Sequence, residues 1–167
     1  MDLFFNLNGI PHISKKYYHE SVIPSLFDIV DDLREQFLKD CKKTVKNRSN
    51  LKLMIDAGWS HPGWWARECT VIAINQENGL PIAIQHVLQG KNYFGSARGC
   101  QIYIFSKLII SLGMEGWAVE QIMKKLKAEG FIVTSLLHDK DASTMKHTLA
   151  VFDDVTEALC LGIYILI

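Results

Sequence analysis

Three apolar runs separated by short turns constrain the fold of this chain more than any other feature of its sequence. They are LKLMIDAGW (51–59), CTVIAINQ (69–76) and LPIAIQHVLQ (80–89). The first leads into the turn-rich SHPGWWARE and the second into ENG. Strand-like runs that follow one another so quickly favour pairing as antiparallel neighbours. We therefore predict a three-strand antiparallel meander in this part of the chain.

Helical periodicity flanks the meander on both sides. Apolar residues recur at every third or fourth position over 14–47, and Pro24 divides that stretch into a short and a longer helix. Residues 111–130 show a second amphipathic helix ending at Gly130, and the apolar run 131–139 reads as a strand. A further helix starts in DASTMKHTLAVF, with Asp141 or Ser143 as its N-cap. The predicted class is α/β: an N-terminal helical segment, the meander, then helix, strand and helix.

Composition limits the classes of function. The 167 residues suit one globular domain, with 49% hydrophobic and 22% charged residues. Lys+Arg and Asp+Glu number 18 each, so no overall basic excess indicates a nucleic-acid-binding protein. A local basic group (Lys39, Lys42, Lys43, Lys46 and Arg48) is more typical of a solvated helix end than of a phosphate-contacting patch. The four cysteines are widely scattered and have neither zinc-ligand spacing nor the pattern of a disulfide framework.

Neither end of the chain reads as a membrane segment. The N-terminus lacks the basic start of a signal peptide, and the apolar CLGIYILI at the C-terminus is too short to span a bilayer. We expect a soluble intracellular protein, nuclear or cytoplasmic, without a membrane partner.

Two aspartates stand at the ends of apolar runs. Asp56 interrupts the first strand, where an unpaired ionised carboxylate costs several kcal/mol. Asp139 ends the later strand, with Asp141 two residues on. If the two strands are neighbours, Asp56 and Asp139 converge and suit a hard cation such as Mg²⁺ or Mn²⁺. The plainer alternative is that each aspartate is a turn or cap residue.

Several stretches, in the same order, resemble one family. LKLMIDAGWSHPGWWARECTVIAINQENGLPIAIQHV is similar to the first block of Mutator-like transposases, whose catalytic domain is RNase H-like. GMEGWAVEQIMKKLKAEGF resembles the Met-Glu helix of that family, and LLHDKDASTMK resembles the motif after its fourth strand. The resemblance covers most of the chain and implies an RNase H-like fold.

The resemblance also implies a site and a substrate. Asp56 matches the first metal-binding acid and Asp139 the second, with Asp141 a less favoured candidate. The implied chemistry is Mg²⁺- or Mn²⁺-dependent cleavage and strand transfer of DNA, with no small-molecule cofactor. Glu115 matches the Met-Glu position, and the resemblance gives it no role in the site. Oligomeric state is left open. His86 and His138 are interpreted as structural.

The sequence departs from the family pattern at three places. The family closes its site with a carboxylate on a later helix, whereas Asp153, Asp154 and Glu157 follow Asp139 too closely, on the predicted next helix. The hydrophobic stretch 97–111 has no counterpart, and the chain stops at Ile167. We therefore predict a helical segment at 1–50 and a truncated, catalytically incomplete core at 51–167.

Two hypotheses follow from these departures. The first is that 97–111 and the apolar tail are not ancestral coding sequence, which spliced transcripts covering both in frame would refute. The second is that the chain is a non-catalytic nucleic-acid or protein-binding module on the same scaffold.

Overall fold

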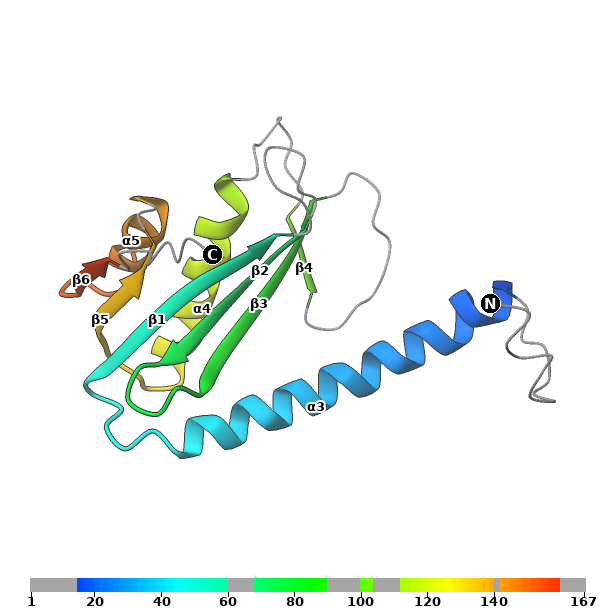
Figure 1. The fold of residues 1–167 in the computed structure, drawn as a ribbon, viewed down its shortest axis with the longest axis horizontal. Helices are drawn as coiled ribbons and strands as arrows, with labels where there is room; N and C mark the ends of the chain where they lie inside the picture. The colour runs from blue at the N-terminus through cyan, green and yellow to red at the C-terminus, as the bar shows by residue number, and fades with distance from the viewer. Residues whose placement is uncertain (1–14, 60–67, 90–99, 104–111, 140–141, 160–167) are drawn as a thin grey trace, which may run out of the picture.

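A computed structural model of the chain describes residues 15–59, 68–89, 100–103, 112–139 and 142–159 (Figure 1). The N-terminal helical elements are α2 (Lys15–Tyr17), the π-helix η1 (Tyr18–Val22) and α3 (Ile23–Lys43). The strands are β1 (Leu51–Trp59), β2 (Glu68–Asn75), β3 (Pro81–Gln89), β4 (Cys100–Tyr103), β5 (Val133–His138) and β6 (Thr156–Leu159). The remaining helices are α4 (Leu112–Ala128) and α5 (Ala142–Leu149). The mixed α/β class is thereby confirmed.

One six-stranded sheet runs in the order β4-β3-β2-β1-β5-β6. Strands β1, β2 and β3 pair as antiparallel neighbours. The turn between β2 and β3 depends on Gly79, whose φ of 69° is in the left-handed region that glycine adopts without strain. The amide N–H of Gly79 donates to the carbonyl oxygen of Asn75 at 2.9 Å and closes the turn.

Strands β5 and β6 extend the sheet in parallel, each after a helix. Strand β5 pairs parallel with β1, and β6 pairs parallel with β5. Helix α4 returns the chain before β5, and α5 returns it before β6. The left-handed φ of 82° at Gly130, in the turn after α4, fits the helix end predicted there.

The sheet differs from the predicted arrangement at both edges. The stretch 97–111 contains strand β4, which pairs parallel with β3, while its residues 97–99 and 104–111 lie outside the described part. The helix predicted to carry Asp153, Asp154 and Glu157 ends at Leu149, and Glu157 lies on strand β6. Both added strands are four residues long and pair on one side within the described residues. Strands so short leave almost no period-two pattern in a sequence.

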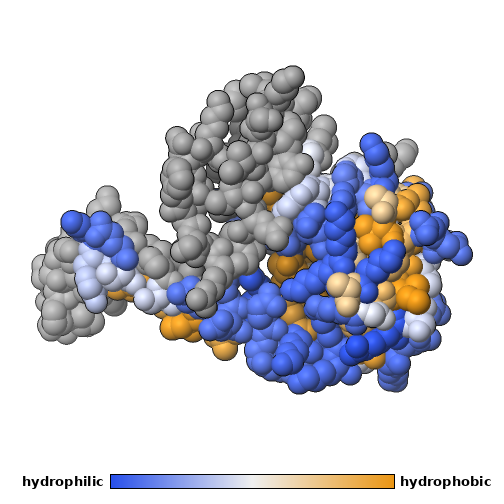
Figure 2. All heavy atoms as spheres, turned by 180° about the vertical axis from the view of Figure 1, so that it is seen from behind, coloured by the Kyte–Doolittle hydropathy of each residue, from blue (hydrophilic) through white to orange (hydrophobic). Residues whose placement is uncertain are grey.

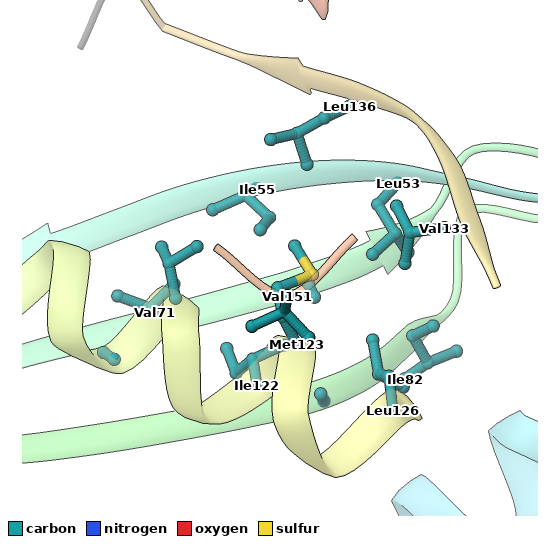
Figure 3. Packing of buried hydrophobic residues seen from close by; sticks show 14 of the residues in the cluster. Leu53, Ile55, Val71, Ile82, Ile122, Met123, Leu126, Val133, Leu136 and Val151 are labelled. Carbon is teal, nitrogen blue, oxygen red and sulfur yellow. The ribbon is translucent and has the colours of Figure 1, made fainter. Parts of the chain in front are cut away.

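Helix α4 covers one face of the sheet and forms the core with it. In β1 the alternate residues Leu51, Leu53 and Ile55 are buried, as the two-residue period of a strand requires. Figure 3 shows side chains of α4, including Ile122 and Met123, packed against this face. The opposite face is more accessible, because Met54 and Ile72 are half-buried and Asp56 is exposed.

Helix α3 joins this body through its C-terminal turns. Leu38 and Cys41 are buried there, as is Val45 just after the helix, and Lys42 Nζ forms an ion pair with Glu129 at 2.6 Å. From this anchor the helix extends past the sheet (Figure 1). Pro24 was predicted to divide this stretch, but α2, η1 and α3 follow one another without a loop, and Pro24 lies in the first turn of α3 directly after the π-helical turn η1. Among the described residues, no helix is both long and apolar enough to cross a membrane.

Candidate functional site

The pairing of β1 with β5 brings the two predicted aspartates to one level of the sheet. Leu53 lies beside Leu136 and Met54 beside Leu137. Asp56 comes two residues after Met54, and Asp139 comes two residues after Leu137. Asp56 follows the buried Ile55 within β1, so the alternation of the strand directs its carboxylate to the face opposite α4. Asp139 follows the buried His138, the last residue of β5, and is exposed as well. Neighbouring strands lie about 4.8 Å apart, so the backbones at these two positions are close to each other.

The reason given from the sequence for a cation at Asp56 is wrong. Asp56 is exposed rather than buried, because only the alternate residues of β1 face the core. Its Oδ1 accepts a hydrogen bond from the amide N–H of Ala57 at 2.9 Å. Its ionised form therefore carries no large desolvation cost. The case for a cation rests instead on two exposed carboxylates at one level of adjacent strands.

Asp153 and Asp154 lie at the far end of the sheet from this pair. They precede β6, whose first residue Thr156 pairs with Ser135. Asp139 comes four residues after Ser135, a separation of roughly 13 Å along an extended strand. This geometry keeps both turn aspartates from the level of Asp56.

Glu157 is engaged elsewhere. Its Oε1 lies 3.0 Å from Nε2 of His138, whose side chain is buried on the core side of β5. His86 is also paired, since its Nδ1 lies 2.7 Å from Oγ1 of Thr70 on the neighbouring strand. Neither pair could be predicted from a local sequence pattern, because both depend on the register between strands.

Glu115 lies in the first turn of α4, on the core side of the sheet. Its Oε1 accepts a hydrogen bond from Oγ1 of Thr144 on α5 at 3.5 Å. Burial, reinforced by the charge of Glu115, raises the pKa of the Cys69 thiol to about 12. Glu115 thus faces the α4–α5–β2 junction. Asp141 lies outside the described residues.

The residues present fit one hard divalent cation. Carboxylate oxygens are the ligands that Mg²⁺ and Mn²⁺ prefer, and Mg²⁺ commonly binds one or two of them together with waters and substrate phosphates. Within the described ranges, no three His, Cys, Asp or Glu side chains are grouped so that they hold a metal. The described residues thus bring two candidate carboxylate ligands, Asp56 and Asp139, to this part of the sheet.

Comparison with known proteins identifies no family. The sequence matches no protein-family profile, and no curated protein sequence matches it. Among solved structures, the chain is similar to RNase H1 from the halophilic archaeon Halobacterium salinarum NRC-1. The two are 12% identical, the match covers 67% of this chain and 86% of that one, and the TM-score is 0.38. A likeness this low assigns neither fold family nor function, so the functional argument rests on strand order and on the two aspartates.

Proposed function

We propose that this chain is an RNase H-like domain of Mutator-like transposase origin that binds one Mg²⁺ or Mn²⁺ through Asp56 and Asp139. The observation that carries the proposal is the parallel pairing of β1 with β5, in a register that levels the two aspartates. The strand order β3-β2-β1-β5-β6, with the last two strands parallel to β1, supports the RNase H-like scaffold.

The related chemistry is cleavage and strand transfer at DNA phosphodiesters. Asp56 and Asp139 would hold the divalent ion, and the chemistry supplied when it is bound would be polarisation of a phosphoryl oxygen and activation of a water or a 3′-hydroxyl. The role of Asp56 and Asp139 is to hold that ion at the exposed face of the sheet, where a nucleic-acid backbone reaches it. Neither aspartate has an ion-pair partner within the described part of the chain that competes for its oxygens.

We infer further that this chain holds the ion without completing cleavage. The two-metal mechanism needs further carboxylates around the scissile phosphate. Asp153 and Asp154 lie at the wrong end of the sheet, and Glu157 is bonded to His138. The alternative function is a non-catalytic binding module on the same scaffold. The apolar residues exposed on α3 favour a protein as its partner.

Thermal unfolding with and without Mn²⁺ tests the metal site. A ligand at a hundredfold its Kd that binds only the folded chain adds about 2.7 kcal/mol of stability. We expect a Mn²⁺-dependent rise in Tm for the wild type that is lost in Asp56→Asn and in Asp139→Asn. The matched control is Asp153→Asn, an exposed turn aspartate, which should keep the rise. An equal rise in all four proteins would place the ion elsewhere.

A plasmid-nicking assay separates metal binding from catalysis. We expect that wild type with Mn²⁺ nicks no more supercoiled DNA than Asp56→Asn does. Nicking that requires both Asp56 and Asp139 would show instead that the chain completes the site.

A further inference from the structure

A cleft of about 720 Å³ lies between helix α3 and the segment that joins α4 to β5. Its lining includes the cationic side chains of Lys39, Lys42, Lys43 and Arg48. Figure 2 shows that the surface around the C-terminal part of α3 is predominantly hydrophilic. Pockets for small ligands commonly have volumes of about 300–1,000 Å³. The cleft is therefore large enough to admit a small anion.

Two of these cations carry a charge that the described residues do not compensate. Lys42 and Lys43 each have a carboxylate oxygen within 2.7 Å of Nζ. Lys39 and Arg48, in contrast, form no ion pair with any residue that the structure describes. Lys39 comes three residues before Lys42, which places both on the same side of α3. An anion that enters the cleft thus meets two unpaired positive charges.

Carboxylates also line the cleft, and they offset only part of its positive charge. Glu35 and Glu129 each have a lysine Nζ within 3.5 Å. Asp32 has no ion pair with a described residue, but it precedes Lys39 by two helical turns, about 10 Å along the helix axis. Charges separated by more than about 8 Å are largely screened at physiological ionic strength. The end of the cleft near Lys39 and Arg48 is therefore positively charged.

Backbone and side-chain contacts hold Arg48 in place. Its carbonyl oxygen accepts a hydrogen bond from the amide N–H of Ile132 at 2.8 Å, which ties its backbone to the segment before β5. Its guanidinium carbon lies 4.9 Å from the centre of the Phe131 ring, which is buried in the core. A guanidinium over a ring keeps its N–H edge available, and its planar fork matches two oxygens of one anion. These N–H groups donate no hydrogen bond to a described residue, so they are free to bind an anion.

We propose that the cleft binds a phosphate group, with Arg48 as the bidentate hydrogen-bond donor and Lys39 as a second cation. Phosphate is favoured over carboxylate because its additional oxygens accept hydrogen bonds from both side chains at once. The sequence favours a solvated helix end for this basic group, whereas the cleft and the position of Arg48 over Phe131 favour a phosphate site. Leu51, where β1 begins, is about 17 Å along the strand from Asp56. The cleft is thus separate from the aspartate pair, and the proposal does not depend on the metal site.

Isothermal titration calorimetry of the full chain with inorganic phosphate tests the site. We expect a Kd about tenfold higher for Arg48→Ala than for wild type, because the variant loses charge-assisted hydrogen bonds. Arg48→Lys should bind about as weakly, since lysine keeps the charge but lacks the planar fork. Lys39→Ala, at an exposed helix position where alanine is well tolerated, should raise the Kd about fivefold. The matched control is Lys146→Ala, an exposed lysine of α5 without an ion pair to a described residue, and it should keep the wild-type Kd.

Binding of a short labelled single-stranded DNA, followed by fluorescence anisotropy in EDTA, identifies the source of the phosphate. If the source is a nucleic-acid backbone, Arg48→Ala should weaken DNA binding about tenfold as well. If the source is a small phosphate-bearing molecule, only the binding of inorganic phosphate should depend on Arg48. Circular dichroism checks that each variant stays folded. The proposal is overturned if neither probe binds wild type, or if Arg48→Ala and Lys39→Ala bind both probes as wild type does. Wild-type affinity in Arg48→Lys would contradict the role of the guanidinium fork.

Discussion

At the level of single residues, the pKa of the Cys69 thiol reflects its burial in β2. Burial, with a smaller contribution from Glu115, raises the pKa of its thiol from 9.0 to about 12. An acid whose pKa rises on folding holds its proton more tightly in the folded chain. Its contribution to stability is therefore complete below about pH 9 and is lost as the pH rises from there towards 12.

We predict that Cys69 makes the wild type lose roughly 1 kcal/mol of unfolding free energy for each pH unit above 9. Denaturant titrations between pH 8 and pH 11, on wild type and on Cys69→Ala, measure this loss. Other groups titrate equally in both proteins, so the stability deficit of Cys69→Ala should shrink as the pH rises. A deficit that stays constant with pH would contradict the assignment.

Glu157 satisfies the buried ring of His138. His138 Nδ1 has no hydrogen-bond partner in the described structure, so Nε2 makes the contact that offsets burial of the ring. Glu157→Ala should cost about 1–3 kcal/mol, the cost of leaving a buried polar group unpaired. Asp154→Ala, in the exposed turn before β6, should stay within about 0.5 kcal/mol of wild type. Urea denaturation compares the two, and equal effects would mean that the His138–Glu157 contact contributes nothing.

At the scale of elements, Gly116 sets how closely α4 and α5 approach. A Cβ atom built at Gly116 would overlap Oγ of Ser143 and the ring of His147 on α5. We expect Gly116→Leu to cost about 1–3 kcal/mol or more, because the added side chain must separate the two helices. Gly58→Ala is the contrasting case, since its Cβ would lie 3.9 Å from the nearest atom outside the adjoining residues, the Thr70 carbonyl oxygen. It should be neutral or stabilising in thermal unfolding, and a larger loss at Gly58 than at Gly116 would contradict this packing.

Elements of different length were predictable to different degrees. Strands β1, β2 and β3 and helix α4 carry long periodic patterns, and their turns contain Gly79 and Gly130. Strands β4 and β6 could not be predicted from the sequence, because four residues show little alternation of apolar and polar side chains. Their stability comes from pairing with a neighbouring strand. The exposure of Asp56 was missed for a related reason: one apolar run does not reveal which alternate residues face a core.

At the scale of the whole molecule, the candidate site is a consequence of topology. Asp56 and Asp139 are 83 positions apart in the chain, and only the return of α4 brings β5 beside β1. From the sequence, this convergence could be predicted only on the condition that the two strands are neighbours. The register that places the two residues at the same level of the sheet depends on the pairing of β1 with β5. The contact of Glu157 with His138 likewise depends on tertiary structure, and neither can be predicted from a local sequence pattern.

The most direct test of the account is a Mn²⁺ titration followed by electron paramagnetic resonance, which measures free Mn²⁺ and so counts the ions bound per chain. We expect wild type and Asp153→Asn each to bind one ion, and Asp56→Asn and Asp139→Asn to bind none at the same concentrations. No bound ion in wild type, or one ion that persists in both site variants, would contradict the claim that this aspartate pair forms a cation site.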